Sequence, residues 1–256
     1  MRRLATKAGL VAAAMGVAVW IWRSRRATTR GVPGALPGLV GSRLTTWLNR
    51  GIHSAMAETL GIRPDDELLD VGCGEGAFLA ERAKAARWVA GVDLSEPKVT
   101  LARRRLARRI EAGTAEVVMA DAAALPWPAD RFSAVTSMDA FPLFPDPQGV
   151  LSEIRRVLRP GGRAVMQIGW RVPDTTSTHL LLGAFRVWNE AEVRRMTEAA
   201  GFDDVSVSYA PVGGDSRILN VLGRLTISTG QIRIVSAVKP VPATKSPEPA
   251  PSGVGR

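Results

Sequence analysis

Residues that carry much of the redox and nucleophilic chemistry of proteins are scarce in this sequence. Among 256 residues, cysteine occurs once, as Cys73, and histidine twice, as His53 and His179. A single cysteine cannot form an internal disulfide, which fits a reducing cytosolic setting. We also predict no metal site.

Acidic residues are absent from the first 57 positions, which hold nine arginines and lysines; the first acid is Glu58. The remainder carries 25 basic and 24 acidic side chains, so almost all of the net charge of +10 belongs to this leader. A basic leader with few aromatic residues favours an anionic membrane surface, and we predict no nucleic-acid partner.

The leader contains an uncharged run of 15 residues, 8–22, between two basic flanks. As a helix it would span about 22 Å, less than the ~30 Å bilayer core, but it could cross if residues 4–7 join it and a lysine snorkels. We predict that residues 1–30 form an apolar helix that anchors the chain in a membrane. A cleaved signal peptide and a soluble helix remain alternatives, although the small-residue cleavage pattern of signal peptides is absent.

The rest of the chain divides into three parts. We expect a linker and leading helix at 31–60, broken near Gly51, one domain at 61–239, and a disordered Pro-rich tail at 240–256. Strands are predicted at 67–71, 88–93, 115–120, 133–138, 163–168, 205–209 and 232–238. Helices are predicted near 76–86, 97–112, 147–158 and 189–201. This alternation predicts an α/β fold with one mostly parallel seven-stranded sheet and helices on both faces.

Three glycines follow the first predicted strand in the stretch LLDVGCGEG. Without Cβ atoms such a loop can adopt positive φ and let a ligand lie against its amides, while the next helix offers unpaired N–H groups. Gly72, Gly74 and Ala77 match a dinucleotide-binding fingerprint. Asp93 follows about 20 residues on, so an NAD(P)-dependent oxidoreductase is one interpretation. The other pattern, D-x-G-x-G-x-G, begins at Asp70.

This second pattern resembles motif I of the class I S-adenosylmethionine (SAM) methyltransferases. Four further stretches resemble later motifs of that family in the same order: VAGVDLS, MADAAALPWPADRFSAV, FPDPQGVLSEIRRVLRPGGRAVM and WNEAEVRRMTEAAGFDDVSV. The resemblance covers residues 49–239 and is greatest to the type 11 group, which includes the ubiquinone and menaquinone methyltransferases. It implies a single Rossmann-like class I methyltransferase domain that uses SAM and releases S-adenosylhomocysteine.

The resemblance also implies which residues contact the cofactor. It places Asp93 on both ribose hydroxyls, Asp121 on the adenine amino group and the Ala122 N–H opposite the adenine ring. A carboxylate suits such tasks because it accepts several O–H or N–H donors. The other implied cofactor-binding residues are Asp70, Gly72, Cys73, Gly74, Leu94 and Met138. Two plainer interpretations stay open, since Asp93 could simply end a strand and Asp121 could cap a helix.

A general base is harder to assign. Many relatives carry a histidine pair after the fourth strand, where this chain has DAFPLF at 139–144. The candidate catalytic residues are Asp139, His53 and His179, and each histidine has the alternative of a packing or surface role. In-line methyl transfer can also proceed by positioning and desolvation alone. A SAM-binding scaffold without turnover therefore remains an alternative to an enzyme.

The favoured hypothesis is a SAM-dependent methyltransferase that acts on a small acceptor. The predicted anchor favours a lipid-soluble acceptor, such as a quinone or isoprenoid-like molecule, held at the same surface. Because SAM is made in the cytosol, we expect the domain on the cytoplasmic side of the membrane; a plainly cytoplasmic protein is the alternative. The basic run at 103–109 alternates with apolar residues at helical spacing, so we interpret it as a solvated helix face.

Overall fold

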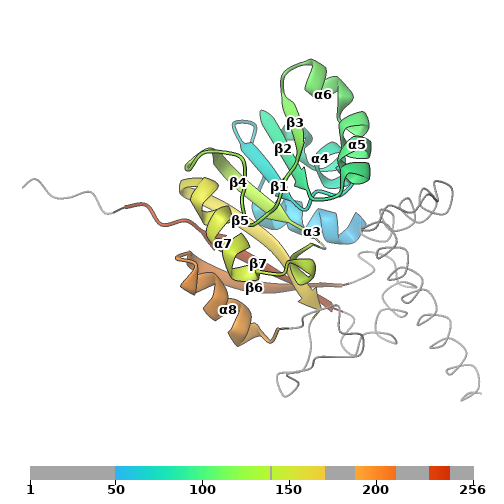
Figure 1. Cartoon of the computed structure of the whole chain (residues 1–256). Coiled ribbons are helices and arrows are strands. Elements are labelled where there is room, and N and C mark those ends of the chain that lie inside the picture. The colour runs from blue at the N-terminus through green and yellow to red at the C-terminus, as the bar shows by residue number, and fades with distance from the viewer. Residues whose placement is uncertain (1–49, 139, 171–187, 212–230, 243–256) are drawn as a thin grey trace, which may run out of the picture.

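The computed structural model describes residues 50–138, 140–170, 188–211 and 231–242. In these ranges one seven-stranded sheet lies between two groups of helices (Figure 1). The strands are β1 (Glu67–Val71), β2 (Trp88–Asp93), β3 (Ala115–Met119), β4 (Phe132–Ser137), β5 (Leu158–Trp170), β6 (Asp203–Pro211) and β7 (Gln231–Val238). The α-helices are α3 (Arg50–Leu60), α4 (Ala77–Glu81), α5 (Glu96–Arg105), α6 (Ala107–Glu111), α7 (Pro147–Val157) and α8 (Glu190–Ala199), and two 3₁₀ turns are η1 (Ala83–Ala85) and η2 (Phe141–Leu143).

The strand order in the sheet is β3-β2-β1-β4-β5-β7-β6. The first five strands pair in parallel, and β7 runs antiparallel to both of its neighbours. The order reverses between β1 and β4, because β2 and β3 follow outward on one side and β5 on the other. In open α/β sheets, ligands bind at the carboxyl ends of the strands beside such a switch point.

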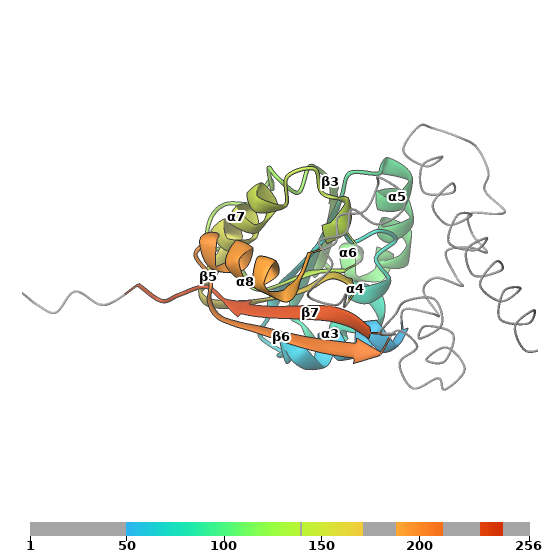
Figure 2. The ribbon, with the colours of Figure 1, turned by 90° about the horizontal axis from the view of Figure 1, so that it is seen from below.

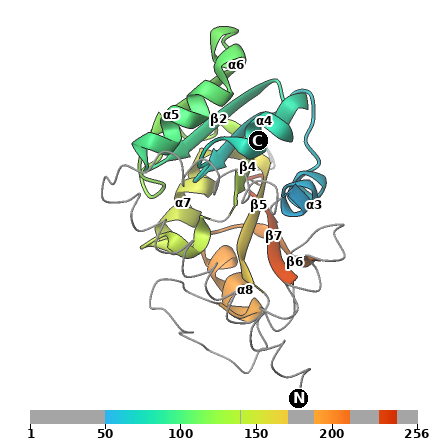
Figure 3. The same ribbon diagram turned by 90° about the vertical axis from the view of Figure 1, so that its right-hand side faces the viewer.

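Alternate side chains of each strand fill two separate cores, one on each face of the sheet. Leu69 and Val71 of β1 pack in one cluster with buried residues of α7, whereas Leu68 belongs to the other cluster with buried residues of α3, α4 and α5. Figures 2 and 3 show α7 and α8 on one side of the sheet and α3 on the opposite side. Burial on both faces explains why β1 is an almost continuous apolar run.

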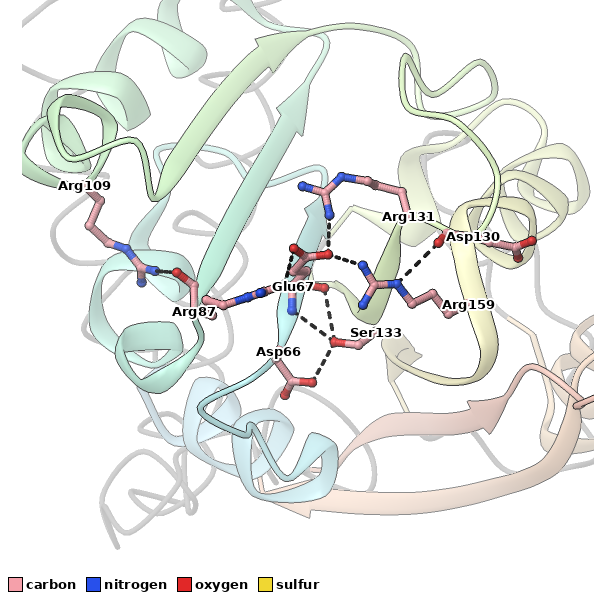
Figure 4. Close-up of polar contacts among 8 residues, drawn as sticks. All are labelled: Asp66, Glu67, Arg87, Arg109, Asp130, Arg131, Ser133 and Arg159. Carbon is pink, nitrogen blue, oxygen red and sulfur yellow. Dashed lines mark hydrogen bonds and ion pairs between the residues drawn. The ribbon is translucent and has the colours of Figure 1, made fainter.

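Ion pairs close the amino-terminal edge of β1, as Figure 4 shows. Three arginines donate hydrogen bonds to the Glu67 carboxylate: Arg87, Arg131 and Arg159. Burial alone raises the pKa of Glu67, but the charges of Arg131, Arg159 and Arg87 outweigh it and hold the pKa below its usual value. This network lies at the edge opposite the carboxyl ends of the strands, so we assign it to stability and not to ligand binding.

Each of the seven predicted strands is confirmed in the described residues, but two predicted helices are wrong. The single helix expected at 97–112 is two helices, α5 and α6, separated at Leu106, where φ is −97° and ψ is 8°. Leu106 stays buried in the core, and the turn directs Arg109 to the carbonyls of Ala83 and Ala86. The helix expected near 76–86 is likewise the short α4 followed by η1.

Other predicted boundaries also shift. The described part of the leading helix is α3, which begins at Arg50; the residues before the predicted break near Gly51 lie outside the described ranges. β5 begins at Leu158, five residues before the expected start, because the chain already pairs with Phe132 of β4 there.

The predicted anchor at 1–30 and most of the tail lie outside the described residues. Among the described residues, no helix is both long and apolar enough to cross a membrane.

Candidate cofactor site

The glycine loop after β1 adopts the backbone that its sequence predicts. Gly72, Gly74 and Gly76 all have left-handed φ, at 74°, 55° and 72°. A Cβ built on Gly72 would lie 2.3 Å from the Ala140 Cβ, so both φ and space require glycine at that position. A Cβ on Gly74 would meet nothing within 4 Å, so the loop borders open space on the side where a side chain would stand.

Backbone hydrogen bonds fix the loop to the neighbouring strand. The N–H groups of Gly72 and Cys73 both donate to the Val92 carbonyl, at 2.8 and 2.9 Å. The Cys73 side chain packs against Gly91, where a Cβ would lie 2.8 Å from the sulfur. Burial, with the charges of Asp70 and Asp93, raises the pKa of the Cys73 thiol well above its usual value. The thiol therefore stays protonated and is a poor nucleophile.

Asp93, at the end of β2, connects the loop to the next helix. Its Oδ2 accepts the Gly74 N–H at 3.0 Å, and its Oδ1 accepts the Ser95 N–H at 2.9 Å. Lys98 Nζ lies 4.0 Å from Oδ2, and the Asp93 side chain is 11% exposed. An ionised carboxylate has about four acceptor positions, so both oxygens can accept further hydrogen bonds from a ribose. The structure thus shows a bracing role that sequence reasoning missed.

Asp70 is buried at the carboxyl-terminal part of β1. Its Oδ1 accepts the Thr136 hydroxyl at 2.9 Å across the parallel pair of β1 and β4. Burial raises the pKa of Asp70 to about 7; the Thr136 hydrogen bond lowers it and the Asp93 charge raises it. The carboxyl is therefore close to half-protonated at neutral pH, and it can lose its proton when a cation binds nearby. Thr136 is a site residue that sequence reasoning missed.

The loops after β2, β3 and β4 contribute apolar and polar groups to the same edge. Leu94, directly after Asp93, is 73% exposed. Met138 is partly buried and packs against the core cluster that includes the buried residues of α4. Leu94, Met119 and Leu143 are three of the four large apolar side chains exposed in the described ranges, and each follows or ends one of these strands. Their positions after or at the ends of parallel strands put them at the carboxyl-terminal edge of the sheet, the edge where open α/β folds bind ligands.

Asp121 lies after β3 in a turn. Its Oδ1 accepts the Ala123 N–H at 2.9 Å, and the residues that follow form a turn and no helix. The alternative of a helix cap is therefore wrong, although the side chain does stabilise the local backbone. Asp121 is exposed and Ala122 is partly exposed, which leaves both accessible to an adenine ring.

Of the candidate catalytic residues, only His53 lies in a described range. It is 1% exposed in α3 and stands edge-to-face with Phe78, the ring centroids 5.9 Å apart. Burial, with the charges of Arg82 and Arg105, lowers the pKa of His53 to about 4. The imidazole is thus neutral at pH 7 and a weak base, as expected for a packing histidine. Asp139 and His179 lie outside the described residues, and within the described part no three potential ligands converge as a metal site would require.

Residues 69–166 match the model of the type 11 methyltransferase family, described as "Methyltransferase domain". Over these residues the chain is similar to that family's methyltransferase domain. This match confirms the predicted family and its cofactor, SAM, and it favours SAM over a dinucleotide in the glycine loop. The residues present fit SAM, because the open space at Gly74 lies beside a carboxylate suited to ribose hydroxyls.

Two curated relatives and one solved structure illustrate the similarity. The chain is 36% identical over 141 residues to the nocamycin O-methyltransferase of Saccharothrix syringae, covering 54% of this chain and 49% of that protein. It is 38% identical over 124 residues to the demethylmenaquinone methyltransferase of Thermus thermophilus, covering 47% and 52%. The chain thus spans about half the length of these relatives.

The structure of the cyclase SpnF superposes with a TM-score of 0.61 at 20% identity, covering 74% of this chain and 81% of that one. At this identity the likeness shows the fold alone. Because that protein is named a cyclase, the fold by itself does not establish methyl transfer.

Proposed function

We propose that this protein is a SAM-dependent methyltransferase that methylates a small organic molecule. The observation that carries the proposal is the left-handed glycine loop tied to Asp93, with its open face at Gly74. When bound, SAM would supply an electrophilic methyl group, and its transfer to a nucleophilic atom of the acceptor would release S-adenosylhomocysteine. The chain's own contribution is to bind, orient and exclude water.

Each residue of the site then has a task. Asp93 accepts the ribose hydroxyls while it braces the loop, and Asp121 with the Ala122 N–H accommodates the adenine. The exposed side chain of Leu94 packs against the adenine ring. Asp70 can release its proton as the cationic cofactor arrives, because its pKa lies near 7. None of these tasks requires His53 as a base.

The acceptor in this proposal is lipid-soluble, and residues 1–30 hold the enzyme at a membrane. Two facts support it: the apolar run between basic flanks at 8–22, and a relative named for a demethylated menaquinone. Fractionation tests the anchor. Full-length protein should sediment with membranes and resist high salt, and deletion of residues 1–30 should release it. A soluble full-length protein would remove the reason for a membrane-bound acceptor.

Methyl transfer is tested with radiolabelled SAM. Full-length protein is incubated with separated lipid and polar extracts, and Asp93→Ala serves as the inactive control. We expect label in the lipid fraction with the unaltered chain only. Label confined to the polar fraction would contradict a lipid-soluble acceptor. Firm SAM binding without label in any fraction would favour the alternative of a non-catalytic scaffold.

A further inference from the structure

Arg233 is a buried cation on the side of the sheet that α8 covers. It lies in β7 opposite Tyr209 of β6 and is 1% exposed. One terminal nitrogen, Nη1, donates to the carbonyl of Trp188, just before α8. Its Nε has no hydrogen-bond partner among the described residues. A guanidinium is always charged in proteins, so an unmet donor on a buried one calls for an explanation.

Among the described residues, positive charge exceeds negative charge around this side chain. Glu190 is the carboxylate that interacts with Arg233; its Oε2 accepts the Tyr209 hydroxyl at 2.6 Å, and Arg194 lies 3.5 Å from its Oε1. The Tyr209 hydrogen bond and the charges of Arg194 and Arg233 hold the pKa of Glu190 below its usual value. Two guanidinium groups thus share one carboxylate. A second anion beside Arg233 would balance a charge that is costly to bury alone.

Aromatic rings connect Arg233 to the glycine loop. Phe141 stands edge-to-face with Trp188, with ring centroids 5.6 Å apart, and with Phe144 at 5.8 Å. A Cβ built on Gly72 would lie 3.8 Å from the Phe144 ring. Arg233 also lies near the carboxyl end of β5. Trp170, the last residue of β5, pairs with Ile232, the residue just before Arg233 in β7. The rings and the cation therefore belong to the edge of the sheet where the cofactor loop lies.

We propose that Arg233 binds an anionic group of the methyl acceptor, whose flat apolar body packs beside the partly exposed rings of Phe144 and Trp188. This inference rests on the proposed methyltransferase function and refines its lipid-soluble acceptor to an aromatic acid that is apolar except for one anionic group. The planar fork of a guanidinium matches a carboxylate or an ionised hydroxyl, and aromatic side chains favour a flat partner. Arg233 is thus a residue that determines acceptor specificity.

A matched pair of probes tests the inference on the unaltered chain. Full-length protein saturated with S-adenosylhomocysteine is titrated by calorimetry with 2-naphthoate and with its neutral analogue 2-naphthamide. We expect the acid to bind about tenfold to a hundredfold more tightly, the range that a charged hydrogen bond supplies. Equal affinities, or no binding of the acid, would overturn the inference. The S-adenosylhomocysteine titration of the same sample reports separately on the proposed function.

Two variants of Arg233 and one control variant assign the preference to Arg233. Arg233→Met keeps an apolar stem and should abolish the preference for the acid, with S-adenosylhomocysteine affinity unchanged. Arg194→Met is the matched control: it removes the other cation of Glu190 and should retain the preference. Arg233→Lys keeps the charge without the fork, so an intermediate preference is expected even if the Met variant fails to fold. A full preference in both Arg233 variants would contradict the assignment.

Discussion

Asp93 has two tasks in the proposed site, because it braces the loop through Gly74 and Ser95 and offers free acceptor positions to a ribose. Replacing Asp93 by Ala removes both. We expect SAM affinity to fall about tenfold to a hundredfold, from the usual strength of hydrogen bonds to charged groups. Calorimetry on the variant, with its unfolding transition as a control for folding, measures the change. An unchanged affinity in folded protein would show that Asp93 does not hold the cofactor.

His53 makes stability depend on pH, since its pKa is lowered from 6.5 to about 4. Between these values the unfolded chain binds more protons than the folded chain, so this group's contribution to stability is present at neutral pH and is lost as pH falls below about 6.5. From pH 7.5 to pH 5 the free energy of unfolding of the unaltered chain should fall by about 2 kcal/mol more than that of the His53→Gln variant. Urea unfolding at the two pH values measures the difference.

The comparison with His53→Gln is needed because Asp70 changes stability with pH in the opposite direction. Its pKa is raised from 3.8 to about 7, so the folded chain binds more protons between these values and Asp70 makes stability fall as pH rises. The total pH profile mixes both effects, whereas the difference between the two proteins isolates His53. If the two profiles are parallel, His53 is not held neutral by burial.

At the scale of elements, the glycine loop provides a matched pair of substitutions. Gly74 and Gly61 both have left-handed φ, at 55° and 58°, and a Cβ on either would meet nothing within 4 Å. Gly61 ends α3, on the opposite edge of the sheet from the cofactor loop. Each change to Ala should cost about 1–2 kcal/mol of folding stability, because a Cβ disfavours left-handed backbone.

Only Gly74→Ala should weaken SAM binding, because its added methyl group enters the space beside the loop amides. Calorimetry on both variants separates backbone strain from ligand contact. Equal losses of SAM affinity in Gly74→Ala and Gly61→Ala would mean that the effect comes from strain and that Gly74 does not face the cofactor.

Most of the sheet could be predicted from sequence, since strands such as β1 and β2 are short apolar runs that end at glycine or aspartate. The break between α5 and α6 could not, because Leu106 leaves the helix to stay in the core beside Gly76. Strands are local patterns, but that bend depends on a contact between segments 30 residues apart in the chain, a separation about which helical periodicity carries no information.

The candidate site shows the same division. The carboxylate of Asp93 was predicted because the position after the second strand has a recognisable local pattern. The roles of Thr136 and Arg233 were not predicted, because the partner of a polar residue inside an apolar strand depends on how that strand pairs with its neighbours. Only the pairing of β1 with β4 sets Thr136 opposite Asp70, and only the pairing of β6 with β7 sets Arg233 opposite Tyr209.

At the scale of the whole molecule, the two edges of the sheet have different chemistry. The amino-terminal edge is closed by three arginines on Glu67, whereas the carboxyl-terminal edge combines bare glycine backbone, Asp93 and exposed apolar side chains such as Leu94. Stability and ligand binding are therefore assigned to opposite edges, as the switch point between β1 and β4 leads one to expect.

Titration of the full-length chain with SAM, S-adenosylhomocysteine and NADH tests the central claim most directly, because all three ligands fit a glycine loop followed by an acid. We predict that SAM and S-adenosylhomocysteine bind at one common site, that each displaces the other, and that NADH neither binds there nor competes. Tight binding of NADH that SAM cannot displace, or the absence of SAM binding by folded protein, would contradict the account.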